Sequence, residues 1–172
     1  MRAGLLLASD DALIAQCEVD RYRASGPGGQ HRNKTESAVR LRHKPTGVVA
    51  IGEDSRSQAE NKVHAVRRLR SAIALHVREP VSLDGFALSP RLAAFVAGGT
   101  APLGARTRQT GEYWAAIAEL LDVLVAGGLE IGATAQRLGI TTGALSKLLL
   151  HDDTVARTVN DLRRARGMRP LR

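Results

Sequence analysis

The sequence of 172 residues predicts an α+β fold, a small sheet with one packed helix, followed by an all-α unit. Three observations support this prediction. Segments with strand propensity alternate with turns before residue 57, apolar residues recur at helical spacing from residue 57 onward, and the composition changes after Pro80. We therefore expect one domain at residues 1–80 and a helical domain at residues 85–172.

Three segments of the first domain have the pattern of β-strands. Residues 17–24 are rich in strand-forming side chains, and apolar residues alternate with arginines at 39–42. The Pro-Thr-Gly sequence at 45–47 is typical of a turn, so residues 48–51 should pair back as a hairpin.

Two helices are expected in the same domain. The short one, at residues 9–16, has Ser9 or Asp10 as its N-cap and acidic residues in its first turn. The long one begins at Ser57, which forms a capping box with Glu60, and it runs to Glu79, where Pro80 stops it.

The second domain is expected to contain only helices. Its first helix has Ser89 as its cap, and a long helix that contains Trp114 as a core residue ends at two glycines. Residues 133–150 resemble a helix-turn-helix with Gly139 at the turn, and a last helix begins at Asp152 or Asp153. This domain should be either a packing module or a contact surface for the ribosome or other RNA.

The positive charge is concentrated in one part of the chain. The formal net charge is +8, and residues 21–80 contain 13 Lys or Arg against five Asp or Glu. The remaining residues contain 12 of each, so they add no net charge. We expect a polyanion to bind the basic segment, although a solvated basic face would have the same composition.

Several classes of protein and site are disfavoured. The single cysteine, Cys17, excludes an internal disulfide and is typical of a reducing compartment. The apolar run near the N-terminus is too short for a signal peptide or a membrane span, so we expect a cytoplasmic protein that does not bind membranes. The histidines lack metal-ligand spacing, and we expect neither a metal nor a cofactor.

A glycine-rich loop at residues 25–30 precedes a run of cations. Gly28 and Gly29 let backbone N–H groups approach a ligand that a Cβ atom would obstruct, and oriented N–H groups stabilise developing negative charge. The loop contains no nucleophile triad, so any hydrolysis here would use positioned water. Gly-Gly-Gln alone is a weak signal that more often belongs to an ordinary loop.

The longer sequence around the loop resembles the catalytic domain of class I peptide chain release factors. The similar segments are "RASGPGGQHRNKTESAVRLRH", "PTGVV" and "RSQAENKVHAVRRLR", which together cover about residues 17–76. The similarity is closest to short, stop-codon-independent relatives that rescue stalled ribosomes. It implies hydrolysis of the ester between the nascent peptide and the P-site tRNA in the peptidyl transferase centre.

The resemblance also implies roles for individual residues. Gly28, Gly29 and Gln30 match the catalytic motif, in which the Gln30 N–H would stabilise the transition state or the leaving ribose oxygen. Gln30 matches the family's methylation site, which implies a glutamine methyltransferase as a partner. We expect contacts with large-subunit RNA from the cations and polar residues around the tip: Arg21, Arg23, His31, Arg32, Asn33, Lys34, Arg40 and Arg42.

Three hypotheses remain open at this point. The chain has no room for a stop-codon-reading domain and no long basic tail, so codon-independent release by a monomer is the first hypothesis. The same chemistry on ribosomes with damaged decoding RNA is another. The third is a non-catalytic RNA- or DNA-binding regulator that uses the helix-turn-helix-like segment. Arg56, Ser57 and Gln58 match the family but are interpreted as a helix start.

Overall fold

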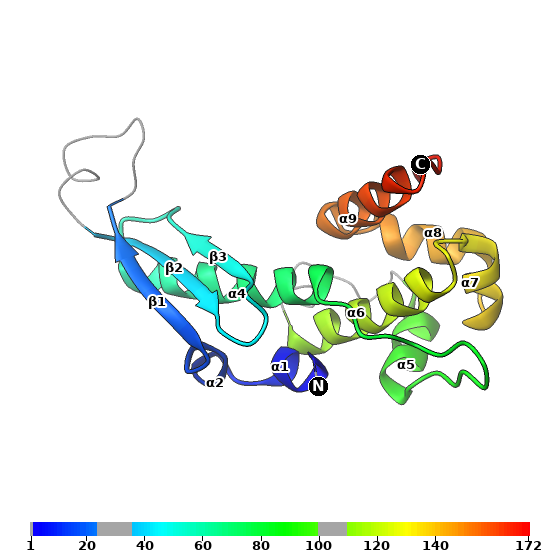
Figure 1. The fold of residues 1–172 in the computed structure, drawn as a ribbon, viewed down its shortest axis with the longest axis horizontal. Coiled ribbons are helices and arrows are strands. Elements are labelled where there is room, and N and C mark those ends of the chain that lie inside the picture. Colours follow the sequence, from blue (N-terminus) through cyan, green and yellow to red (C-terminus); the bar gives the residue numbers. More distant parts are fainter. Residues whose placement is uncertain (1, 24–35, 100–109) are drawn as a thin grey trace. The chain divides into compact units, whose positions relative to one another are not determined.

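The chain forms two compact units, Met1–Val77 and Arg78–Arg172 (Figure 1). The computed structural model describes residues 2–23, 36–99 and 110–172. The first unit combines helices with a small antiparallel sheet, which confirms the α+β prediction for this part of the chain. The described residues of the second unit form helices and connections.

The sheet of the first unit has three strands in the order β1 (Cys17–Tyr22), β2 (Ala38–His43) and β3 (Val49–Gly52). Both pairings are antiparallel, and the turn at residues 45–47 joins β2 to β3 as predicted. Alternate residues of β2 are buried, because one face of this central strand packs against the core.

Helix α4 (Gln58–His76) covers the inner face of the sheet (Figure 1). Its residues Leu69 and Ile73 are fully buried, as is Leu41 of β2. Two short helices, α1 (Arg2–Leu7) and α2 (Asp10–Ile14), contribute the buried Leu6 and Leu13 to the same core. Apolar burial of these side chains is the main force that holds helix and sheet together.

Gly52 allows β3 and α4 to approach each other closely. A Cβ atom at this position would lie 2.0 Å from the backbone oxygen of Asn61 and 2.9 Å from the nitrogen of Ala65. Both atoms belong to the helix backbone, so neither can move without shifting α4. No local sequence pattern around Gly52 predicts this contact.

The second unit is built around α6 (Gly111–Ala126), most of whose residues are buried. Helices α5 (Pro90–Gly98), α7 (Ile131–Arg137), α8 (Thr142–Leu150) and α9 (Asp153–Ala165) complete it. Trp114 is a buried core residue as expected, and it packs edge-on against Tyr113 at a centroid distance of 5.0 Å. The helix-turn-helix interpretation of α7 and α8 stays a prediction.

Several local predictions match the structure. Ser9, Ser57, Ser89 and Asp152 are N-caps whose side chains accept backbone N–H groups. Gly139 has a φ of 68°, which allows the chain to turn between α7 and α8.

Three local predictions differ from the structure. Helix α1 was not expected, because "RAGLLL" is short and lacks a cap signal. Helix α4 ends at His76 rather than Glu79, since Val77 is already extended. Glu60 does not complete a direct capping box: its carboxylate contacts the Ser55 hydroxyl, which in turn accepts the N–H of Ser57.

We predict that Gly52→Ala lowers the free energy of unfolding of the first unit by about 1–3 kcal/mol, because α4 must shift away from β3. Urea denaturation measures this change. Gly4→Ala is the matched control: Gly4 lies in α1 with open space around it, so alanine should leave stability unchanged or raise it by up to about 1 kcal/mol. Equal stability of the two variants would contradict the proposed contact.

His43 should make the first unit sensitive to acid. Its side chain is fully buried, with Nδ1 2.8 Å from the Thr46 hydroxyl, and burial lowers its pKa from the ordinary value of 6.5. The unfolded chain therefore binds the proton more readily, and the free energy of unfolding should fall as the pH drops below about 6.5. His43→Gln should reduce this pH dependence, measured by urea denaturation across the range. An unchanged slope in the variant would show that other groups cause it.

Candidate functional site

The predicted catalytic loop is held by a stem in the first unit. We define the loop stem as Tyr22 and Arg23 at the end of β1 and residues 36–38 at the start of β2. Gly28, Gly29 and Gln30 lie between these two segments but outside the described residues, as do His31, Arg32, Asn33 and Lys34. The stem is therefore the part of the candidate site that the structure describes.

The two sides of the stem are paired where β1 ends and β2 begins. Tyr22 is the register partner of Ala38, and beyond this pair the Arg23 guanidinium lies 3.8 Å from the Glu36 carboxylate. Both side chains of the ion pair are largely exposed, at 62% and 58%, so water screens it and it adds little stability. Backbone pairing in the ladder holds this end of the loop more firmly than the charges do.

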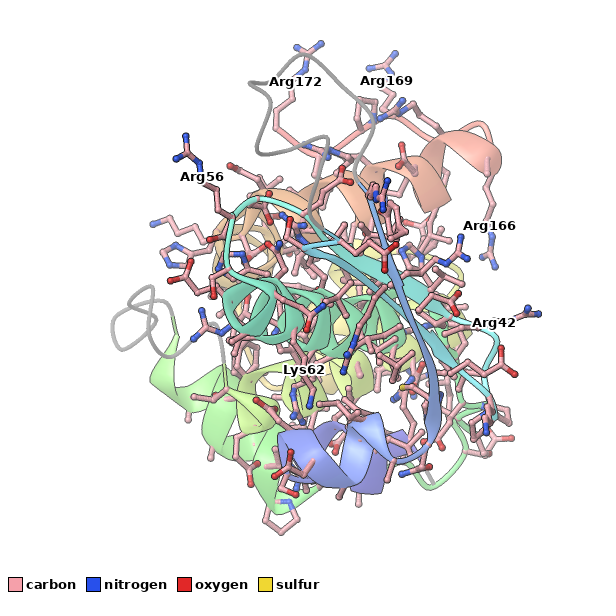
Figure 2. The ribbon with its side chains drawn as sticks, turned by 90° about the vertical axis from the view of Figure 1, so that its left-hand side faces the viewer. Arg42, Arg56, Lys62, Arg166, Arg169 and Arg172 are labelled. Carbon is pink, nitrogen blue, oxygen red and sulfur yellow. The ribbon has the colours of Figure 1, made fainter. Side chains whose placement is uncertain are left out.

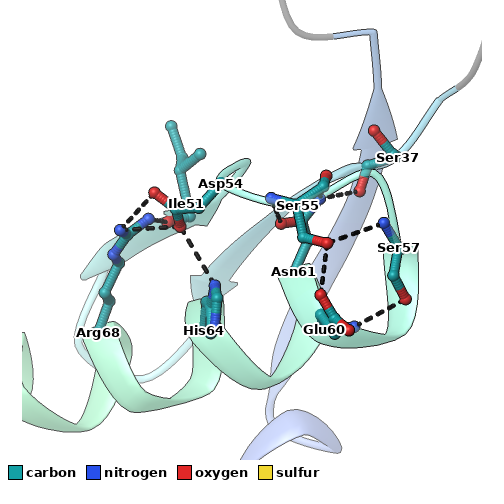
Figure 3. A network of polar contacts seen from close by, with 9 residues as sticks. All are labelled: Ser37, Ile51, Asp54, Ser55, Ser57, Glu60, Asn61, His64 and Arg68. Atoms are coloured by element: carbon teal, nitrogen blue, oxygen red, sulfur yellow. Dashed lines mark hydrogen bonds and ion pairs between the residues drawn. The ribbon is translucent and has the colours of Figure 1, made fainter. Parts of the chain in front are cut away.

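Asn61 of α4 anchors the stem from below (Figure 3). Its side chain is fully buried, and its Nδ2 donates to the backbone oxygens of Ser37 at 2.8 Å and Ser55 at 2.7 Å. Its Oδ1 accepts the N–H of Ser55 at 2.9 Å. One buried amide thus satisfies three backbone groups from two segments that otherwise run separately.

Gln58 provides a second link from α4 to the same segment. Its Nε2 donates to the backbone oxygen of Glu36 at 3.0 Å. Gln58 and Asn61 are three residues apart, so both amides lie on one side of the helix. The interpretation of residues 56–58 as a helix start is correct for Ser57 but incomplete for Gln58, and this spacing of two amides was the signal that could have revealed it.

Arg68 and Asp54 hold the neighbouring connection between β3 and α4 (Figure 3). The Arg68 guanidinium donates to the Ile51 oxygen at 2.7 Å and to the Asp54 carboxylate at 2.9 Å. His64 Nδ1 lies 3.3 Å from the same carboxylate. The hydrogen bond from Arg68 is the main reason that the pKa of Asp54 is lowered.

The predicted RNA-contacting arginines do not share one face of the sheet. Arg40 and Arg42 lie on the outer face of β2, whereas Arg21 is the register partner of the buried Val39 and so lies on the other face. Arg40 is bound to Asp20 at 2.7 Å, and its guanidinium lies 5.9 Å from the Tyr22 ring centre. This cation therefore helps to hold the sheet edge.

Other cations of the basic segment differ in their availability. The Arg70 side chain is buried and donates to the backbone oxygens of Leu6 and Ala8 and to the Asp10 carboxylate. It ties α1 and α2 to α4. Arg42, Arg56 and Lys62 instead extend into solvent without an ion pair to any described residue (Figure 2).

A metal cluster, a reactive cysteine and a membrane-spanning helix were each sought among the described residues. No group of three His, Cys, Asp or Glu side chains gathers in a way that could hold a metal among them. Cys17 is buried, and burial raises the pKa of its thiol, which disfavours the reactive thiolate. No helix within the described ranges is long and apolar enough to cross a membrane.

We predict that Asn61→Asp destabilises the first unit by about 2–4 kcal/mol, because a buried carboxylate would face two backbone oxygens that have lost their donor. Gln58→Glu makes the same chemical change at an exposed bond and should cost less than about 1 kcal/mol. Urea denaturation of both variants checks the difference. Similar losses in the two variants would exclude a special role for the buried amide.

Comparison with known proteins agrees with this geometry. The RF-1 domain family matches residues 13–82. The chain is 53% identical over 62 residues to peptide chain release factor 1 of Erythrobacter litoralis, which covers 36% of this chain and 18% of that protein. It is 55% identical over 56 residues to peptide chain release factor 2 of Buchnera aphidicola, which covers 33% and 15% respectively.

The match includes the loop, its stem and α4, and it stops near the boundary between the two units. The chain matches less than a fifth of the length of these two curated relatives. Residues 13–82 therefore match the RF-1 domain family and are similar to the corresponding part of peptide chain release factors 1 and 2.

Proposed function

We propose that this chain hydrolyses the peptidyl-tRNA ester in the ribosomal peptidyl transferase centre without reading a stop codon. The observation that carries the proposal is a Gly-Gly-Gln sequence placed between β1 and β2 of an RF-1 domain. The reaction adds water across the ester: the water oxygen joins the peptide carbonyl carbon, and the tRNA ribose oxygen leaves with a proton.

In this proposal, the catalytic group is the backbone N–H of Gln30. A backbone N–H has no side chain whose pKa could be tuned. Its contribution to the rate therefore depends on how accurately the fold positions it. Gly28 and Gly29 leave room for the approach, and the Gln30 side chain shapes the pocket for water. The loop stem supports this mechanism because Gln58 and Asn61 fix the two residues that follow the loop.

The ribosome and the P-site peptidyl-tRNA are the proposed partners. Arg42, Arg56 and Lys62 are exposed and lack carboxylate partners among the described residues, which makes them available to RNA phosphates (Figure 2). A glutamine methyltransferase that modifies Gln30 is a further proposed partner, and mass spectrometry of the chain from its natural host tests it.

The proposal of codon independence rests on the helical unit that follows the RF-1 domain. Residues 78–172 form a helical unit, and the family match does not extend beyond residue 82. Ribosomes with vacant, truncated, stop-programmed or damaged decoding sites distinguish general rescue from the damage-specific alternative. Peptide release that requires a stop codon would contradict codon independence.

We predict that Gly28→Ala and Gly29→Ala each reduce peptide release by about 10²-fold or more, because a Cβ atom obstructs the backbone approach. The assay uses ribosomes that carry labelled peptidyl-tRNA on an mRNA without a stop codon. Ribosome binding should change by less than about twofold, since no cation is removed.

The matched control replaces Arg42, Arg56 and Lys62 with glutamine. This variant should show the opposite pattern, with weaker and less salt-dependent binding but an intact release step at saturating concentration. Absence of release by the natural chain on every complex would defeat the hydrolase proposal. If the chain then bound a specific DNA or RNA duplex at moderate salt, the regulator hypothesis would replace it.

A further inference from the structure

The C-terminal end of the second unit is strongly basic, whereas the rest of the unit is not. Residues 157–172 contain six arginines and one aspartate, whereas residues 78–156 contain six Lys or Arg against eight Asp or Glu. The residues outside 21–80 have no net charge in total, but they include a strongly basic segment at 157–172. This segment lies outside the RF-1 match, so the family does not explain it.

The C-terminal residues are folded back onto α9. Helix α9 ends at Ala165, and Gly167 then reverses the chain with a φ of 69°. The N–H of Met168 donates to the Arg163 oxygen at 2.9 Å. The Asn160 side chain then accepts the N–H of Leu171 at 2.7 Å and donates to the oxygen of the same residue at 3.3 Å. A side-chain amide thus pairs with the tail as a neighbouring strand would.

Arg163 reinforces this arrangement from the inside. Its Nε donates to the Arg169 oxygen at 2.8 Å, and its NH1 donates to the Leu129 oxygen at 2.5 Å. One guanidinium therefore joins the tail and α9 to the turn after α6. Because these contacts occupy its guanidinium, Arg163 is a structural residue and is not available to a ligand.

The other arginines of the tail are available. Arg166, Arg169 and Arg172 are exposed and have no ion pair with the described residues, and Figure 2 shows them extending away from the ribbon. Arg169 and Arg172 line a hollow of about 500 Å³ together with Pro170. We name Arg166, Arg169 and Arg172 the arginine tail.

We propose that the arginine tail is a second RNA-binding surface, which binds the phosphate backbone of structured RNA without reading its sequence. Guanidinium groups bind phosphate oxygens in a bidentate manner, and a tail that is already ordered loses little conformational entropy on binding. The choice of RNA as the polyanion rests on the proposed function. The surface itself rests on the charges and contacts of the second unit.

Two other partners fit the surface less well. Among the described residues, the strongly exposed large apolar side chains are Leu7, Val19, Val49, Ile51 and Val63, all in the first unit. The arginine tail therefore lacks the apolar side chains that insert into a membrane or form the centre of a protein interface. Base reading by α8 is also disfavoured, because its single cation is Lys147.

The test measures binding of the full-length chain to a fluorescently labelled RNA stem-loop over a range of salt concentrations. Replacing Arg166, Arg169 and Arg172 with glutamine should weaken binding roughly tenfold or more at low salt and reduce the salt slope by about 2–3. Asp161→Asn should instead tighten binding, because it releases Arg164 from an ion pair of 3.0 Å. Unchanged binding by the triple variant would overturn the proposal.

Asn160→Ala separates an ordered surface from simple net charge. It keeps all six arginines but removes both bonds to Leu171, so the proposal predicts several-fold weaker binding with a similar salt slope. Wild-type affinity in this variant would show that charge alone acts and would refute the ordered surface. Tighter binding of the natural chain to anionic phospholipid vesicles or to a DNA duplex than to the stem-loop would refute RNA as the partner.

The outcome is distinguishable from that of the hydrolase proposal. Gly28→Ala should bind the stem-loop normally and fail to release peptide, whereas the arginine-tail variant should retain the release step at saturating concentration. If the natural chain never releases peptide but the arginine-tail variant loses RNA binding, the RNA-binding surface is supported and the hydrolase proposal is refuted. If the natural chain releases peptide but the arginine-tail variant binds the stem-loop normally, the hydrolase proposal is supported and the RNA-binding surface is refuted.

Discussion

The buried amide of Asn61 is the interaction on which the first unit most depends. Two connections, one that follows the Gly-Gly-Gln loop and one that leads from β3 into α4, run side by side without forming a ladder. Their backbone groups would be costly to bury unpaired, and Asn61 satisfies three of them. Gly52 permits this arrangement because it lets β3 approach the same turn of α4. The proposed catalysis by the backbone N–H of Gln30 would need a fixed frame, and these contacts hold the residues that follow the loop.

Net charge alone is a poor guide to which cations of this protein meet a ligand. Arg68, Arg70 and Arg163 donate to backbone oxygens and hold segments together. Arg42, Arg56 and Lys62 in the first unit, and the arginine tail in the second, have no such contacts among the described residues (Figure 2). A guanidinium has five donors on a long side chain, so it serves equally well as a structural link and as a phosphate ligand. Only the contacts of each residue distinguish the two uses.

Local signals explain why most elements were predictable. Each of the helices α2, α4, α5 and α9 has a side-chain cap next to the residue that begins it, and β2 has a clear alternation. Helix α1 lacks such signals, and it is stabilised by contacts from distant residues, including the bond from Arg70 to the Leu6 oxygen. The contacts of the Ser55 hydroxyl with Glu60 and with the N–H of Ser57 could not be predicted for the same reason, because they depend on how the preceding connection lies against the helix.

The sequence by itself indicated the resemblance to release factors, the Gly-Gly-Gln sequence, the hairpin of β2 and β3 and the long helix, because these follow from short motifs and periodic patterns. The tertiary structure decided what holds the loop stem, which arginines are structural and how the C-terminal tail is ordered. Gln58 lies 22 residues from Glu36, and Arg163 lies 34 from Leu129. Such pairings result from packing over long sequence separations, and no local pattern encodes them.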